Sequence, residues 1–287
     1  MGNGWSEWPL MFFTVAGQCV IGGYLIMAMA LLAGRLAEED IRRIRQWMFL
    51  LWLVMGLGFL ASMMHLGSPL RAMNSLNRIG ASPLSNEIAA GSLFFALGGG
   101  IYWLVAVLNR MPPWLDTFWL VLTALSGLAF LYAMGRVYMI DTVPTWNTVY
   151  TPLGFVLTVF IGGPPLGCLL LQAAGIKAPG WRYLPWISVI AVLVSVTAAM
   201  MQAAGLAAIH SSVQQASTIV PDYGLLMAGR ALLLALGLAC WLWPTTRGKT
   251  PPTAGLALGL LLIVGGELVG RAVFYGLHMT VGMAIAS

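Results

Sequence analysis

The chain has 287 residues, of which 60% are hydrophobic and only 8% are charged, and its formal net charge is +5. A soluble domain carries about 25% charged residues, so this composition excludes an ordinary soluble protein and predicts an integral membrane protein. The basic residues lie mostly in short connections, which indicates membrane topology and excludes nucleic acid as a partner.

Eight apolar stretches are long enough to cross a bilayer, which requires about 20 residues in a helix. In chain order they cover residues 10–32, 48–65, 88–107, 114–137, 152–174, 184–207, 225–243 and 254–276. The alternating pattern of a membrane β-barrel is absent from the sequence. The sequence therefore predicts an all-α integral membrane protein, with one polytopic domain over residues 1–287 that forms a bundle of eight transmembrane helices.

The distribution of basic residues between the connections predicts the orientation of the bundle. The odd-numbered connections contain nine Lys and Arg residues, namely Arg35, Arg42, Arg43, Arg45, Arg110, Lys177, Arg182, Arg247 and Lys249. The even-numbered connections contain Arg71 and Arg78 only. Because basic connections stay in the cytoplasm, the odd ones are predicted to be cytoplasmic and both termini periplasmic. The first connection is expected to be a plain charged linker.

The even-numbered connections are the longer ones, at about 66–87, 138–151 and 209–224, and they predict a periplasmic surface for docking or chemistry. The embedded ionisable residues gather at the same end. They are His65, Glu87, Arg136, Asp141, His210, Arg230, Glu267, Arg271 and His278. A proton pump or secondary transporter, the alternative function, needs polar groups across the whole membrane. A one-sided arrangement instead favours a lipid-borne quinone that exchanges protons at one surface, for which His and carboxylate side chains are suited.

Structural roles compete with this interpretation at several positions. Glu87 follows Ser85 and Asn86, a pattern typical of a helix cap with an acid in the first turn. Glu267 and Arg271 are four residues apart and are expected to pair with each other. His210 and His278 also fit interfacial positions with satisfied hydrogen bonds.

Metal and cofactor sites fit the sequence poorly. Haem b requires two facing axial ligands inside the bundle, whereas the three histidines lie at helix ends. Cys19, Cys168 and Cys240 are isolated in apolar stretches, and no C-x-x-C motif is present. We therefore expect no haem, no iron–sulfur cluster and no other metal site in this protein.

Long segments of the sequence resemble the membrane anchor subunits of bacterial anaerobic dimethyl sulfoxide reductase, the DmsC type. The resemblance is carried by FLASMMHLGSPLRAMNSLNRIGASPLSNEI, IDTVPTWNTVYTPL, IHSSVQQASTIVPDYG and GGELVGRAVFYGLHMTVGMAIAS, and it continues in the opening WSEWPLMFFTVAGQCVIGG. It runs from end to end with the same number of helices. A paralogue that serves a related molybdoenzyme is equally compatible.

The resemblance implies a multi-pass subunit of the bacterial inner membrane that functions in anaerobic respiration. It implies two partners in a heterotrimer, a four-cluster iron–sulfur electron-transfer subunit and a molybdopterin catalytic subunit. The anchor itself carries no molybdopterin and no catalytic centre for the terminal substrate; it oxidises menaquinol and passes the electrons to the iron–sulfur subunit.

The family's quinol-site histidine in H-L-G-S-P corresponds to His65, and the acid in S-N-E-I corresponds to Glu87. We expect these two residues to handle the quinol protons, with Arg71, Arg78 and Arg271 nearby. Because the ionisable residues lie outward, the partners are expected on the periplasmic face.

Overall fold

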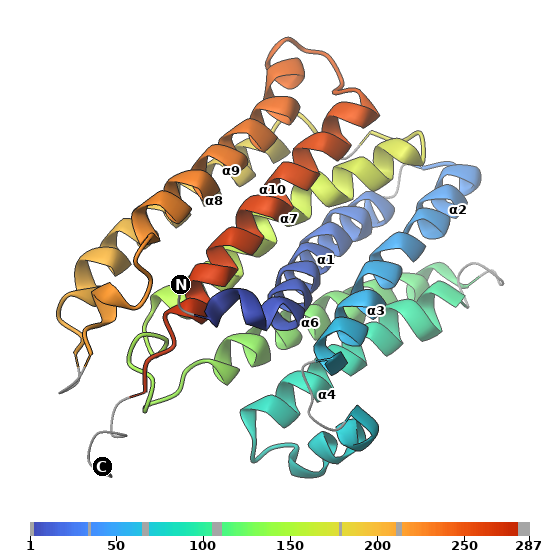
Figure 1. Ribbon diagram of the computed structural model, residues 1–287. Helices are drawn as coiled ribbons and strands as arrows, with labels where there is room; N and C mark the ends of the chain where they lie inside the picture. The colour runs from blue at the N-terminus through green and yellow to red at the C-terminus, as the bar shows by residue number, and fades with distance from the viewer. Residues whose placement is uncertain are drawn as a thin grey trace.

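The computed structural model describes residues 3–33, 36–64, 69–104, 111–177, 180–210 and 214–280. These residues form an elongated bundle of roughly parallel and antiparallel helices (Figure 1). The helices and short helical segments are η1 (Asn3–Glu7), α1 (Trp8–Leu32), α2 (Glu38–Trp47), α3 (Phe49–Met64), η2 (Pro69–Arg78), α4 (Pro83–Phe95), the π-helix η3 (Ala96–Trp103), α6 (Pro113–Val137), α7 (Tyr150–Ala173), α8 (Leu184–Leu206), η4 (Ala216–Thr218), α9 (Tyr223–Thr246) and α10 (Thr253–Gly276).

Seven of the predicted spans are confirmed, within the described residues, as helices long and apolar enough to cross a membrane. The predicted span at 88–107 instead forms α4 and η3, which follow each other directly and cover 13 and 8 residues. Neither is long enough alone, and residues 105–110 lie outside the described part. The eighth span therefore stays a prediction.

The first connection differs from the expected plain linker, because residues Glu38–Trp47 form the helix α2. Three acidic residues occupy its first turn and Arg45 lies in its last turn, which matches the helix dipole at both ends. Exposed ion pairs from Arg42 and Arg43 to Glu39 add i,i+3 and i,i+4 contacts, and Ile44 anchors the helix in the core.

Helix α1 is the centre of the bundle. It packs against α3, α6, α7 and α10, and nearly all of its length is buried. A helix that is apolar on all sides is expected in such a central position. Its contact with α7 is especially close, because a Cβ added at Gly163 of α7 would collide with the Cα of Gly22. The two backbones touch there because neither residue has a side chain.

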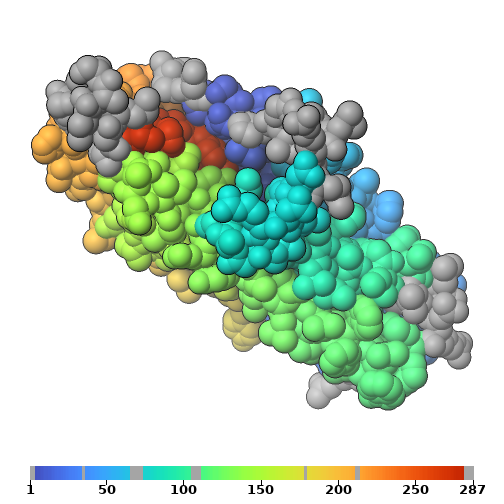
Figure 2. Space-filling model, turned by 90° about the horizontal axis from the view of Figure 1, so that it is seen from below, coloured from blue at the N-terminus to red at the C-terminus, as the bar shows by residue number. Residues whose placement is uncertain are grey.

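The two ends of the bundle differ in construction. The end that we call the outer end holds η1, η2, η4 and the 138–149 segment, and η1 packs on the last turns of α10. The first and last described helices therefore begin and end on the same side of the bundle. Viewed from below, the cyan η2 and the lime-green segment leading into α7 lie on the surface (Figure 2).

We predict that Gly163→Ala destabilises the protein by about 1–3 kcal/mol, because the added methyl group forces α1 and α7 apart. Thermal unfolding of the purified protein, followed by circular dichroism, measures the effect. The matched control is Gly154→Ala in the same helix, where an added Cβ meets nothing within 4 Å. Equal midpoints for the two variants would show that the close contact does not stabilise the bundle.

Candidate functional site

Glu87 lies in the interior of the bundle, at 4% exposure, on the outer half of α4. The predicted cap at Ser85 and Asn86 is wrong. Helix α4 begins at Pro83, and Ser82 caps it by accepting a hydrogen bond from the Ser85 backbone N–H at 3.5 Å. Glu87 is therefore beyond the first turn, where the helix dipole does not explain an acid.

One oxygen of the Glu87 carboxyl group also lacks a partner among the described residues. Its Oε1 atom is buried and has no hydrogen-bond partner within the described residues. Buried polar atoms are nearly always hydrogen-bonded, so an unpaired carboxyl oxygen calls for a ligand, a water or a residue outside the described part.

A pair of buried tyrosines lies near both Glu87 and Arg271. The hydroxyl oxygens of Tyr138 and Tyr275 are 2.5 Å apart, and both side chains are buried. Glu87 and Arg271 are each close enough to interact electrostatically with both phenols. The hydrogen bond joins the residue that follows α6 to α10.

Arg271 is buried at 6% exposure between α1, α7 and α10. Its Nη2 donates to Gln18 Oε1 at 2.7 Å and to Thr158 Oγ1 at 3.4 Å, and its guanidinium carbon lies 3.9 Å from the ring centroid of Phe155. A cation–π contact of this kind strengthens when water is absent. Gln18, Thr158 and Phe155 thus replace the water that the buried guanidinium has lost.

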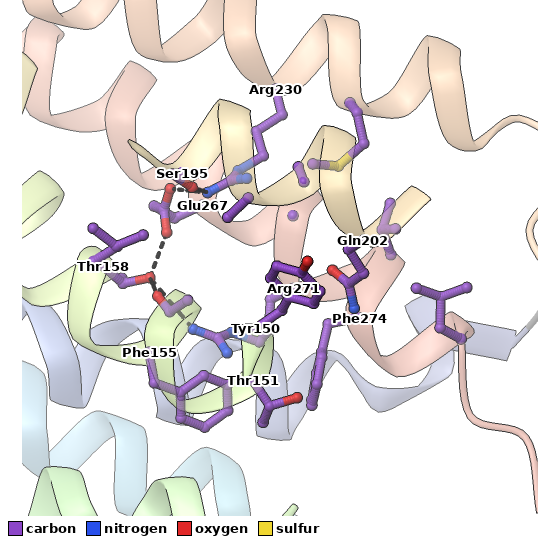
Figure 3. A pocket seen from close by; sticks show the side chains of 18 of the residues that line it. Tyr150, Thr151, Phe155, Thr158, Ser195, Gln202, Arg230, Glu267, Arg271 and Phe274 are labelled. Atoms are coloured by element: carbon purple, nitrogen blue, oxygen red, sulfur yellow. Dashed lines mark hydrogen bonds and ion pairs between the residues drawn. The ribbon is translucent and has the colours of Figure 1, made fainter. Parts of the chain in front are cut away.

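The expected pairing of Glu267 with Arg271 is wrong. Glu267 Oε1 instead forms an ion pair with Arg230 Nη2 of α9 at 2.9 Å, and Glu267 Oε2 accepts from Thr158 Oγ1 at 2.5 Å. Arg230 Nη2 also donates to Ser195 Oγ of α8 at 2.8 Å. Thr158 lies between Glu267 and Arg271 and hydrogen-bonds to both, so it links these two residues of α10 (Figure 3).

These charges line a cavity of about 80 Å³ between α7, α8, α9 and α10, which we call the polar chamber. The polar residues of its wall include Thr158, Ser195, Gln202, Arg230, Glu267 and Arg271. Ser195 precedes the outer end of α8 at Leu206 by eleven residues, or about 16 Å along the helix. Polar groups therefore reach from the outer end to about the middle of the span, deeper than the rim expected from the sequence.

The remaining predicted site residues are dispersed or lie outside the described residues. His65 is one of those outside. Arg71 is within η2, with its side chain outside the described part, and Arg78 is exposed at the end of η2. No described contact joins either arginine to the buried charges. Of the other histidines, His210 and His278 are exposed, and the His278 ring lies 4.7 Å from that of Trp146.

The inner end also contains an ion pair that the sequence did not predict. Arg45 Nη2 lies 2.7 Å from Asp116 Oδ1, which also accepts from the Tyr102 hydroxyl at 3.0 Å. This cluster joins α2, η3 and α6. Within the described residues, no group of three or more His, Cys, Asp or Glu side chains could hold a metal ion.

The site residues missed by the sequence are the uncharged or distant partners: Gln18, Thr158 and Ser195, together with the Tyr138–Tyr275 pair. None of them carries a charge that would single it out in the sequence, and the partner of each lies far along the sequence. Arg230 was visible as an embedded charge, but its link to Glu267 depends on how α9 packs on α10.

Known proteins match this one over its whole length. Residues 1–277 match the family model described as DMSO reductase anchor subunit (DmsC). The protein is 57% identical to the C subunit of anaerobic dimethyl sulfoxide reductase of Escherichia coli (strain K12), over 100% of both sequences. It is 55% identical to the anaerobic dimethyl sulfoxide reductase subunit YnfH of the same organism over 100% of both sequences. It is 41% identical to the C subunit of the Haemophilus influenzae reductase over 99% of both.

The buried ion pair yields a stability prediction. Arg230→Met and Glu267→Gln should each lower the free energy of unfolding by about 3–5 kcal/mol, because each leaves one buried group without its partner. The double variant should lose much less than the sum of the two. Thermal unfolding of the purified protein measures all three, with Asp141→Asn, an exposed acid at the outer end, as control. Additive losses would show that the pair is not coupled.

Proposed function

The protein belongs to the family of DMSO reductase anchor subunits, and from this we propose that it oxidises menaquinol in the membrane and passes the electrons to a partner subunit. As an anchor, it leaves the chemistry of the terminal substrate to another subunit. The partners that we propose are an iron–sulfur subunit with four clusters and a molybdopterin catalytic subunit, in a heterotrimer at the bacterial inner membrane.

The observation that carries this proposal is the buried carboxyl group of Glu87 with an unpaired oxygen. A quinol that becomes a quinone releases its two hydroxyl protons, and a carboxylate shielded from water accepts or relays a proton efficiently when it lies within hydrogen-bond reach. Glu87 Oε1 is such an acceptor atom, without a partner among the described residues, in a helix of the bundle.

His65 and Glu87 divide the proton handling in this proposal. His65 follows directly after α3 in the sequence, and Glu87 lies in α4, the next α-helix along the sequence. His65 accepts or hydrogen-bonds one hydroxyl proton, and Glu87 relays it to the outer side. Arg71, Arg78 and Arg271 contribute positive charge to the surroundings.

One observation supports the alternative of a stand-alone transporter or pump: the Arg230–Glu267 ion pair lies deeper in the bundle than the sequence predicts. The described polar network nevertheless stops at that depth. Among the described residues, the inner cluster of Arg45, Asp116 and Tyr102 shares no hydrogen bond or ion pair with it. Full-length similarity to anchor subunits favours the quinol-oxidising role.

The proposal predicts that His65→Arg and Glu87→Gln abolish quinol-dependent reduction of the terminal substrate by the complex. Reduction with an artificial dye should be unchanged, because the dye delivers electrons directly to the partner subunits. Initial rates with a menaquinol analogue and with the dye measure both activities in membranes. Asp141→Asn, which also removes an acid at the outer end, serves as the matched control and should keep both. Normal quinol oxidation in the two site variants would refute the assignment.

We also propose that the partners dock on the periplasmic face, because the outer end carries the longer connections and the buried acid. Added protease should then cleave the partner subunits in spheroplasts and right-side-out vesicles, and spare them in inverted vesicles. Immunoblots of the partner subunits give the readout, and a cytoplasmic marker enzyme checks that the vesicles are sealed. Cleavage only in inverted vesicles would place the partners on the cytoplasmic face.

A further inference from the structure

A second cavity adjoins the polar chamber on its lipid-facing side. It measures about 340 Å³ and runs between α8 and α9; we call it the α8–α9 groove. Its lining is mainly apolar and includes Ala199, Met200 and Ala203 from α8 and Met227, Ala228 and Ala231 from α9. Met200 is 70% exposed, so the groove opens toward the lipid.

The groove and the chamber share walls. Arg230, Tyr223, Met227 and Ala199 line both of them. Arg230 therefore stands at the boundary between an apolar channel open to lipid and a buried polar pocket. Its Nε atom is buried and has no hydrogen-bond partner within the described residues, while its Nη2 is engaged by Ser195 and Glu267.

The position of Arg230 is set by a glycine. A Cβ at Gly270 of α10 would lie 2.6 Å from Arg230 Nε, so the absent side chain provides the space in which the guanidinium lies. An unpaired buried N–H on a charged group costs free energy, and a ligand oxygen that accepts from it recovers this cost. The guanidinium thus packs on Gly270, which lines the chamber, while the Arg230 side chain also lines the groove.

We propose that the α8–α9 groove binds a membrane quinone, separate from the Glu87 site, with its tail in the groove and its ring at Arg230, where one ring oxygen accepts a hydrogen bond from the guanidinium. The choice of quinone as the ligand class rests on the proposed function. The separation rests on the fold, because Glu87 lies on α4, whereas the groove is formed by α8 and α9.

Depth within the membrane selects this ligand over a phospholipid. Arg230 lies seven residues into α9, about 10 Å from the outer helix end, and its partner Ser195 lies deeper still. A charged phosphate is expensive at such a depth in hydrocarbon. A neutral quinone ring is not, and its oxygens accept hydrogen bonds. Arg230 is already paired with Glu267, so Arg230 itself requires no anion.

Photolabelling of the intact complex in lipid nanodiscs with an azido-quinone tests the proposal. Peptide mass spectrometry should find the label on residues of the groove, and unlabelled menaquinone should displace it. Ala203→Trp fills the groove and should reduce this labelling about tenfold, which corresponds to a loss of about 1.4 kcal/mol of binding free energy. Ala204→Trp, the adjacent lipid-facing position that does not line the groove, is the matched control and should keep it.

Several outcomes would overturn the proposal. They are absence of label from α8 and α9, equal labelling in both tryptophan variants, or displacement by phospholipid and not by menaquinone. Glu87→Gln separates the two sites: groove labelling should persist in this variant even though quinol turnover is lost. Loss of groove labelling in Glu87→Gln would show a single site. Normal turnover in Glu87→Gln with intact groove labelling would instead contradict the proposed function and leave the groove assignment standing.

Discussion

The arrangement of the bundle depends on the burial of Arg271 and Glu267 on one helix face of α10. A charge removed from water costs several kcal/mol unless protein groups replace its hydration. Here Gln18 of α1, Thr158 of α7 and Arg230 of α9 supply those groups, so four helices must meet at fixed positions. Such a network need not add net stability, because desolvation offsets the attraction, but it disfavours other packings in which the same charges would be unpaired. The Gly22–Gly163 contact brings α1 and α7 close enough for Gln18 and Thr158 to share Arg271.

Most of the helices could be predicted from the sequence, because span length and apolar content are properties of contiguous residues. The start of α4 could also have been predicted: Ser82 followed by Pro83 is a typical cap and first helical residue, and it places Glu87 beyond the first turn. The helix α2 was missed because its charge was taken for a linker, although its acids and Arg45 follow the helix dipole. The Arg230–Glu267 pair could not be predicted, since residues 37 positions apart meet only through the packing of α9 on α10.

The two ends of the molecule hold their buried charges in different surroundings. At the inner end, Arg45, Asp116 and Tyr102 bond to one another and fasten α2 to α6. Buried atoms without a partner among the described residues occur at both ends, at Arg45 Nε as well as at Glu87 Oε1 and Arg230 Nε. The outer half differs in that Arg230, Glu267 and Arg271 line a cavity between four helices. The one-sidedness seen in the sequence is therefore a matter of where buried charges meet open space, not of how many of their atoms are paired.

The hydrogen bond between Gln18 and Arg271 spans 253 positions of the sequence and has a consequence for biosynthesis. Helix α1 is synthesised before α10, yet α10 holds the cation that donates to Gln18 Oε1, whereas the acceptor of Gln18 Nε2, Met134 Sδ, is already in α6. At a rate of roughly 5–20 residues per second, the interval between Gln18 and Arg271 is on the order of 10–50 s. During this time Gln18 Oε1 needs a temporary donor, in water or in the insertion machinery. Helix α10 therefore completes the centre of the bundle. A protein truncated before α10 would leave a buried polar atom of α1 without its donor, which is a defect that cellular proteases recognise.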